Sequence, residues 1–208
     1  MSFSSMTDLL ERLVEILGHP EFLAMRGLGN EVPLFIQPYD PAKEDELRRT
    51  VDSVASRLRT KGLTVVTLDL FDLVLEELEE NRILQPLIEH EPTFKKEELL
   101  ETLQNYSDPE THLVPRLVAK MSGEGTQLAL ITGSGRVYPF LRTHAILESL
   151  QPRMPNHPVV FFFPGEYVQE PDRGSYLRLF GSAASHEGTY NPYYRAINLE
   201  QYRIRVAR

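Results

Sequence analysis

Two polar segments that follow apolar runs contain the residue types best suited to chemistry, and the first is Thr132–Arg136 (TGSGR). Glycine-rich backbone between a strand and a helix can bind phosphate through its amide groups. A dinucleotide-binding fingerprint needs a further glycine where this chain has Tyr138, and the sequence contains no P-loop motif. The segment therefore predicts either a tight turn that needs glycine or a weak anion site. The candidate anion site consists of Gly133, Ser134, Gly135 and Arg136.

The second segment begins at Asp69, which follows the apolar run Leu63–Leu68. A strand that ends in Asp resembles the magnesium-binding strand of nucleotide hydrolases, but here Leu70 follows instead of a second carboxylate. Asp69 or Asp72 is equally suited to cap the helix that comes next. Asp69 could also form an acid and base pair with Glu166, provided that their two strands are neighbours in the sheet.

Other kinds of catalytic site are not indicated. The six histidines are dispersed, with no H-E-x-x-H motif and no pair on one helical face. Ser134 lacks the G-x-S-x-G spacing of a nucleophile elbow, and the absence of cysteine excludes thiolate ligands and thiol nucleophiles. The sequence therefore predicts no catalytic residues, no bound metal and no cofactor.

Composition and charge describe one globular domain, residues 1–208, with ordinary hydrophobic content (41%) and charged content (25%). No apolar run is long enough to span a membrane, and the N-terminus does not resemble a signal peptide, so a cytoplasmic protein is expected. The net charge of −8 argues against DNA binding by the chain alone. The arginine-rich end is a solvated tail or a partner contact.

Four apolar runs alternate with amphipathic helices, which predicts a mainly parallel sheet. We expect an α/β three-layer sandwich with four to five strands and a P-loop-NTPase-like or Rossmann-like topology that lacks the nucleotide-binding motifs. An N-terminal helix is expected over residues 5–18, and another follows Pro139. The expected main strands are residues 33–37, 63–68, 127–131 and 159–163, with weaker candidates at 177–181 and 194–199.

The fourth run, Val159–Phe163, is typical of a strand that is buried on both faces. Pro164-Gly165 is predicted to end this strand, leaving Glu166 and Tyr167 at its carboxyl end. In open α/β sheets ligands bind at the carboxyl ends of the strands, so this edge is where a pocket is expected.

Several polar and aromatic residues are candidates for partner contacts. Arg142 and His144 interrupt an apolar helical stretch and either anchor the strand-end loops or face a partner. The Tyr/Arg-rich segment 186–208 either forms an interface or packs against the sheet edge. The full set of partner-binding candidates is Arg142, His144, Glu166, Tyr167, Arg178, Tyr193, Tyr194 and Arg195.

Four segments in order, ITGSGRVYPFLRTHAILESLQ, VVFFFPGEY, SYLRLFG and NPYYRAINL, resemble the BrxB family of BREX bacteriophage-defence systems. The most specific parts are FFFPGEY, LRLFG and YYRA. The resemblance covers most of the chain, from the N-terminal helix through residue 199.

The resemblance implies a small cytoplasmic accessory protein without an established catalytic motif. Its implied partners are other BREX proteins: the phosphatase-like PglZ, the ATPase BrxC and, as a further candidate, the methyltransferase PglX. The implied function is that of an adaptor in the complex that methylates host DNA and restricts phage. The alternative is a degenerate nucleotide- or phosphate-binding enzyme that uses the strand-end loops.

Overall fold

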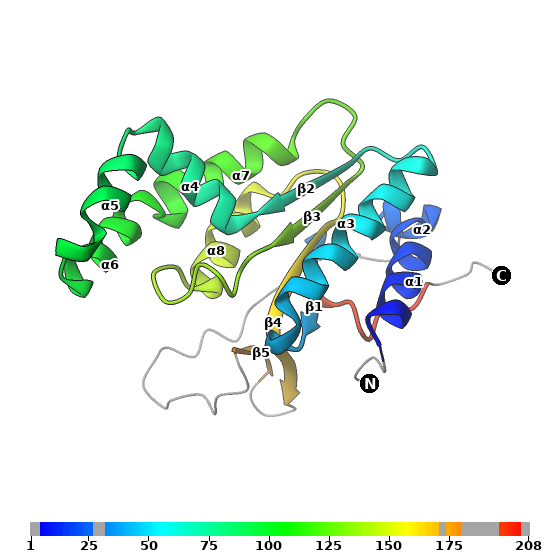
Figure 1. The fold of residues 1–208 in the computed structure, drawn as a ribbon. Helices are drawn as coiled ribbons and strands as arrows, with labels where there is room; N and C mark the ends of the chain where they lie inside the picture. Colours follow the sequence, from blue (N-terminus) through cyan, green and yellow to red (C-terminus); the bar gives the residue numbers. More distant parts are fainter. Residues whose placement is uncertain (1–4, 27–31, 171–173, 180–195, 205–208) are drawn as a thin grey trace.

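Parallel strands form the centre of the molecule in the order β2–β3–β4–β1–β6, and β5 pairs antiparallel with β4 (Figure 1). This computed structural model describes residues 5–26, 32–170, 174–179 and 196–204. The strands are β1 (Leu34–Tyr39), β2 (Val65–Asp69), β3 (Leu128–Thr132), β4 (Val159–Glu170), β5 (Gly174–Leu179) and β6 (Ile197–Asn198). The predicted α/β class and mainly parallel sheet are confirmed.

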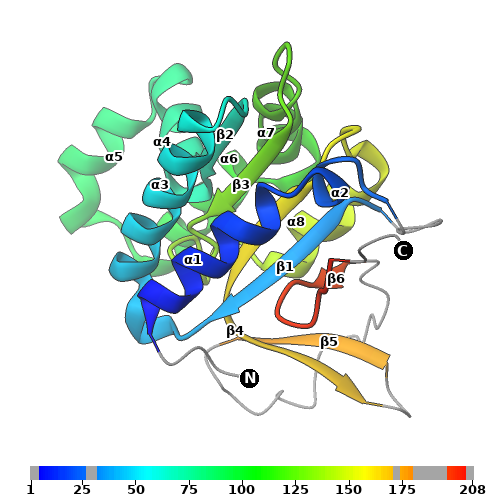
Figure 2. The same cartoon turned by 90° about the vertical axis from the view of Figure 1, so that its right-hand side faces the viewer.

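Helices cover both faces of the sheet, because alternate residues of the central strands point to opposite sides (Figure 2). Phe35 and Phe162 pack with α1, α2 and α3, whereas Ile36 and Phe161 pack with α4, α7 and α8. The helices are α1 (Met6–Leu17), α2 (Pro20–Leu23), α3 (Glu44–Thr60), α4 (Leu70–Glu80), α5 (Leu84–His90), α6 (Lys96–Tyr106), α7 (Val114–Met121) and α8 (Thr143–Leu150).

The helix that follows β1 and the helix that precedes β4 lie on opposite faces of the sheet. Helix α3 carries the chain from β1 to the far strand β2 on one face, while α4–α7 and then α8 return on the other face. Neighbouring strands whose connections lie on opposite faces mark the switch point of a doubly wound sheet, where ligands usually bind. Asp40 starts the first of these connections, since its side chain accepts the Ala42 amide before Pro41–Lys43 leads into α3.

The helix predicted after Pro139 begins later than expected. Residues 134–140 form turns, and α8 starts at Thr143 with Arg142 as its N-cap residue in an extended conformation. Arg142 therefore precedes the helix and does not lie on its surface beside His144. The region 82–110, which has weak periodicity, contains the two short helices α5 and α6.

The predicted end of β4 at Pro164-Gly165 is wrong, because the strand continues to Glu170. Pro164 is the last residue paired with β1, and beyond it the strand pairs antiparallel with β5. Gly165 has a φ of 151°. A Cβ at this position would lie so close to the carbonyl oxygen of Arg178 that the two atoms would overlap. The glycine thus allows the strand to leave the sheet as a two-stranded ribbon.

Helices α5 and α6 form a helical arm, residues 84–106, at one end of the molecule (Figure 1). Neither helix contains a fully buried residue. The arm is therefore attached to the body through partly buried side chains such as Leu84 and Leu103, which pack against the core.

Among the described residues, no helix is both long and apolar enough to cross a membrane.

Candidate functional site

Asp69 occupies the centre of the carboxyl edge between β2 and β3. Its carboxylate accepts the Phe71 amide at 2.9 Å, as the N-cap of α4, and the Thr132 hydroxyl at 3.2 Å. Arg136 Nη1 lies 3.1 Å from Asp69 Oδ1, and Arg48 Nε lies 3.5 Å from Oδ2. The Asp69 side chain is only 8% exposed, and it contacts two arginines and the N-terminus of α4.

The turn after β3 is shaped to receive this carboxylate. Gly133 has a φ of 82°, and a Cβ at this position would lie 2.7 Å from Asp69 Cγ. Of the two interpretations of the TGSGR segment, this geometry favours the tight turn that needs glycine, because glycine allows the Asp69 carboxylate to approach the backbone. The anion at this turn is part of the protein itself.

The other candidates for the anion site also make internal contacts. Ser134 is buried, and its hydroxyl donates to the Phe162 carbonyl at 2.9 Å. A Cβ on Gly135 would lie 3.1 Å from both Glu44 Oε2 and a Pro164 ring carbon. The guanidinium of Arg136 lies 4.5 Å from the centre of the Phe71 ring. These residues thus make internal contacts with Asp69, Phe162, Pro164 and Phe71.

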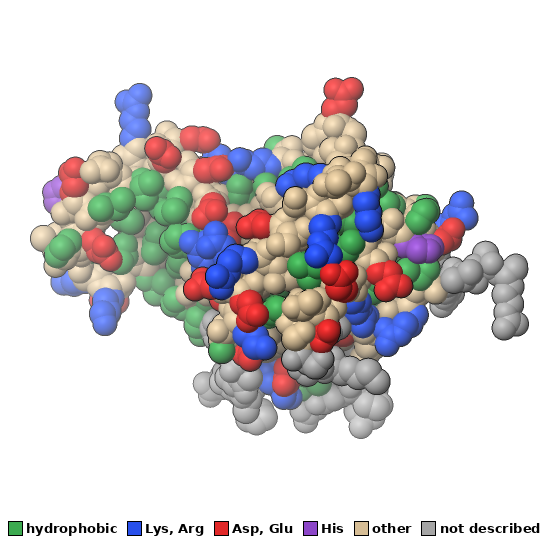
Figure 3. Space-filling view, turned by 45° about the vertical axis from the view of Figure 1, so that its right-hand side comes forward, with side chains coloured by type: hydrophobic (Ala, Val, Ile, Leu, Met, Phe, Trp, Pro, Cys, Tyr) green, Lys and Arg blue, Asp and Glu red, His purple; other side chains and the backbone are tan. Residues whose placement is uncertain are grey.

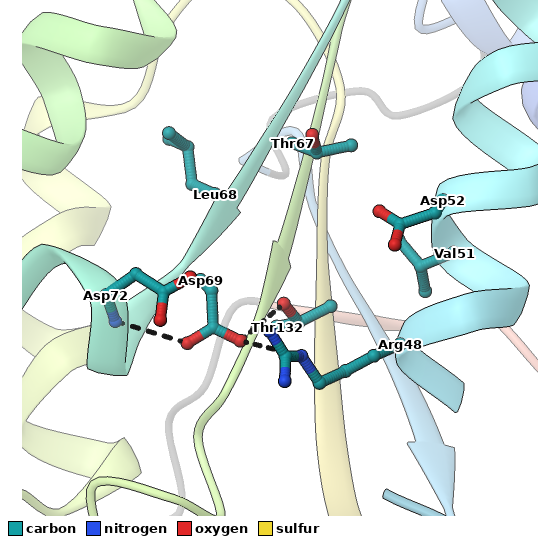
Figure 4. Close-up of a pocket in the computed structure, with 8 residues that line it drawn as sticks. All are labelled: Arg48, Val51, Asp52, Thr67, Leu68, Asp69, Asp72 and Thr132. Carbon is teal, nitrogen blue, oxygen red and sulfur yellow. Dashed lines mark hydrogen bonds and ion pairs between the residues drawn. The ribbon is translucent and has the colours of Figure 1, made fainter. Parts of the chain in front are cut away.

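A small pocket opens beside Asp69 (Figure 4). Its volume is about 150 Å³, which is room for a few water molecules but less than pockets for nucleotide-sized ligands usually provide. Residues from α3, β2, α4 and β3 line it: Arg48, Val51, Asp52, Thr67, Leu68, Asp69, Asp72 and Thr132. Within the described part of the chain, no His, Asp and Glu cluster is suited to hold a metal ion.

A tyrosine and a glutamate occupy the switch point between β1 and β4. The Tyr39 hydroxyl donates a hydrogen bond to Glu44 Oε2, and burial together with this carboxylate strongly raises the pKa of Tyr39. The phenol therefore remains protonated and keeps donating at physiological pH. This pair was missed by sequence reasoning, although a Tyr at a strand end five residues before an acidic first helical turn is a usable signal.

Asp69 and Glu166 do not meet the condition set for an acid and base pair. Strand β3 lies between β2 and β4, so the two strands are not neighbours. Glu166 instead faces Arg178 across the β4–β5 ribbon, with Arg178 Nη1 donating to Glu166 Oε2 at 3.0 Å.

The remaining partner-binding candidates are separated in the structure. Tyr167 donates from its hydroxyl to the Ala196 carbonyl at 2.9 Å, which connects the ribbon to the segment before β6. Arg142 and His144 are exposed at the start of α8, and partial burial followed by the charge of Arg142 lowers the pKa of His144. Tyr193, Tyr194 and Arg195 lie outside the described residues.

An ion-pair cluster between α4 and α7 was not anticipated from the sequence. Arg116 contacts Glu76, Glu77 and Glu80 on α4, and the His112 ring lies 3.0 Å from Glu77 Oε1. Burial alone would raise the pKa of Glu77, but hydrogen bonds from Arg116 and His112 outweigh it, and the pKa is lowered. This cluster joins two helices and lies away from the strand ends.

Fold and site together define a doubly wound α/β protein whose carboxyl edge is filled by its own charged side chains. A family model described as "BREX protein BrxB" matches residues 66–199. A BREX protein BrxB of Bacillus cereus (strain H3081.97) is 32% identical over 200 residues, covering 93% of this chain and 98% of that protein. The chain therefore belongs to the BrxB family of BREX proteins.

A second relative is a BREX protein BrxB of Escherichia coli O9:H4 (strain HS). It is 24% identical over 158 residues, which cover 76% of this chain and 78% of that protein. No solved structure matches this chain at a significant level.

Proposed function

We propose that this chain is a non-catalytic adaptor of a BREX system, which links PglZ to BrxC in the assembly that methylates host DNA and restricts phage. PglX is a further candidate partner. Membership of the BrxB family supports a role within BREX. The adaptor role and the choice of partners are our proposal.

The observation that carries this proposal is the filled edge of the sheet. The Asp69 carboxylate lies against Gly133 at the edge of the sheet where ligands usually bind, and Arg136 and Arg48 neutralise it. At the switch point, Tyr39 and Glu44 bind each other. A sheet whose usual ligand site is reduced to a small pocket in this way can still provide a rigid surface for other proteins.

Pairwise binding tests the proposal directly. The purified chain would be immobilised and exposed in turn to PglZ, BrxC and PglX from the same BREX system, with binding measured by biolayer interferometry. We expect association with PglZ and with BrxC. Failure to bind either protein at micromolar concentrations would contradict the adaptor role.

The alternative, a degenerate nucleotide- or phosphate-binding enzyme, predicts stabilisation by its ligand. A ligand at 100 times its dissociation constant would add about 2.7 kcal/mol to the free energy of unfolding. Because Asp69 already occupies the glycine turn, we expect no change in melting temperature with ATP, GTP, cyclic nucleotides or inorganic phosphate, each with Mg²⁺. A reproducible increase with any of them, lost in Arg136→Ala, would favour the alternative.

A further inference from the structure

The helical arm exposes large hydrophobic side chains. Ile88 on α5 is 56% exposed and Phe94 between the helices is 38% exposed. On α5, half-buried Leu87 lies next to Ile88, whereas Leu84 packs against the core. On α6, Leu99 and Leu100 are half-buried, whereas Leu103 packs against the core.

These side chains are part of a broader apolar surface. Figure 3 shows hydrophobic side chains gathered on the part of the molecule that carries α4, α5 and α6. Single exposed hydrophobic residues are common on proteins, whereas contiguous groups mark binding surfaces. Two helices with no fully buried residue and with exposed apolar side chains are thus suited to accept a third helix.

The charge of this region indicates the chemistry of the partner. The arm, residues 84–106, contains five Glu and two Lys, which gives it a formal charge of −3. On the arm, Glu91, Glu97 and Glu101 form no ion pair with the other described residues. Glu97 and Glu101 lie one turn apart, beside Leu100 on α6.

We infer that the helical arm binds a cationic amphipathic helix of another BREX protein, an inference that rests on the proposed adaptor function. The leucine, isoleucine and phenylalanine side chains bury the apolar face of that helix. The flanking carboxylates pair with its Lys and Arg side chains and accelerate association. A second copy of the arm would place like charges against each other, so the surface is unsuited to self-association.

Two synthetic peptides test whether the arm binds an amphipathic helix. Each has about 18 residues, which form about five helical turns. Both carry leucines at i, i+3, i+4 and i+7; the remaining positions are Lys and Arg in one peptide and Glu and Gln in the other. Fluorescence anisotropy at about 0.05 M and 0.3 M salt measures binding to the full-length chain. We expect binding of the cationic peptide that weakens at the higher salt concentration, and no binding of the acidic peptide.

Variants separate the apolar contribution from the charge. Ile88→Gln combined with Phe94→Gln changes exposed side chains without changing the charge, so the chain should stay folded by circular dichroism while peptide affinity falls about tenfold or more. Glu97→Gln with Glu101→Gln should weaken binding mainly at low salt. Two exposed acids outside the arm provide the matched control, Glu46→Gln with Glu124→Gln, and should leave affinity unchanged.

Equal binding of the two peptides, or unchanged affinity in the Ile88/Phe94 variant, would overturn the inference. The same variants are then tested against PglZ and BrxC. If the peptide needs the arm but wild type binds neither protein, the inference stands and the proposed function fails. If wild type binds PglZ or BrxC and the arm variants bind peptide and protein equally well, the adaptor function stands and the inference fails.

Discussion

At the residue scale, the contact between Gly133 and Asp69 joins the carboxyl ends of β2 and β3. Replacing Gly133 with Ala adds a Cβ that overlaps the carboxylate, at a backbone φ of 82° that disfavours L-residues. Gly62→Ala is the matched control, because Gly62 has a φ of 89° and open space around its Cα.

In urea unfolding, we expect Gly62→Ala to cost about 1–2 kcal/mol and Gly133→Ala about 1–3 kcal/mol more. The additional cost should shrink when Asp69→Ala is present in the same chain, which a double-mutant cycle measures. Equal costs for the two glycine replacements would show that the Asp69 carboxylate does not occupy the turn.

Glu77 makes a second prediction at the residue scale, about pH. Its pKa is lowered in the folded protein, so its ion pairs stabilise the fold above the pKa of the unfolded chain. This contribution is lost as pH falls through the lowered pKa. We expect Glu77→Gln to flatten the decrease in unfolding free energy between about pH 5 and pH 3, whereas Glu79→Gln, at an exposed neighbour, retains the wild-type slope.

At the scale of elements, continuous apolar runs and helix caps could be predicted from the sequence. The run Val159–Phe163 is buried throughout, and Asp40 and Asp69 cap the segments that follow their strands. The continuation of β4 beyond Pro164 could not be predicted, because Pro-Gly usually ends a strand and its role here depends on pairing with β5.

The same limit applies to the candidate site. The TGSGR segment was recognised, but the sequence could not show that Asp69, more than sixty residues earlier, fills its turn. That contact arises from the parallel pairing of β2 with β3, which places Asp69 opposite Thr132. Contacts between distant segments depend on strand order, and strand order was left open by the sequence.

The β4–β5 ribbon provides a prediction at the element scale. Arg178 and Glu166 face each other across the ribbon with side chains 33% and 60% exposed, so Arg178→Ala should leave the fold intact. If the ribbon contacts a partner, this variant should bind PglZ or BrxC about tenfold more weakly. Arg57→Ala, which removes a comparable exposed ion pair with Glu11, should bind like wild type. Unchanged binding of Arg178→Ala would show that this face of the ribbon does not contact PglZ or BrxC.

At the scale of the whole molecule, the helical arm lies at one end, and the two-stranded ribbon extends beyond the part of β4 that pairs with β1 (Figure 1). Two separate surfaces are what a protein needs in order to contact two partners at the same time. Because the arm has a formal charge of −3, its surface is suited to a cationic partner.

The most direct test of the adaptor role is size-exclusion chromatography of PglZ and BrxC, mixed with and without this chain. We expect the two proteins to elute separately on their own and to elute together, with this chain in the same fractions, when it is added. If PglZ and BrxC elute together equally well without it, or if it fails to elute with either of them, the chain does not link the two proteins.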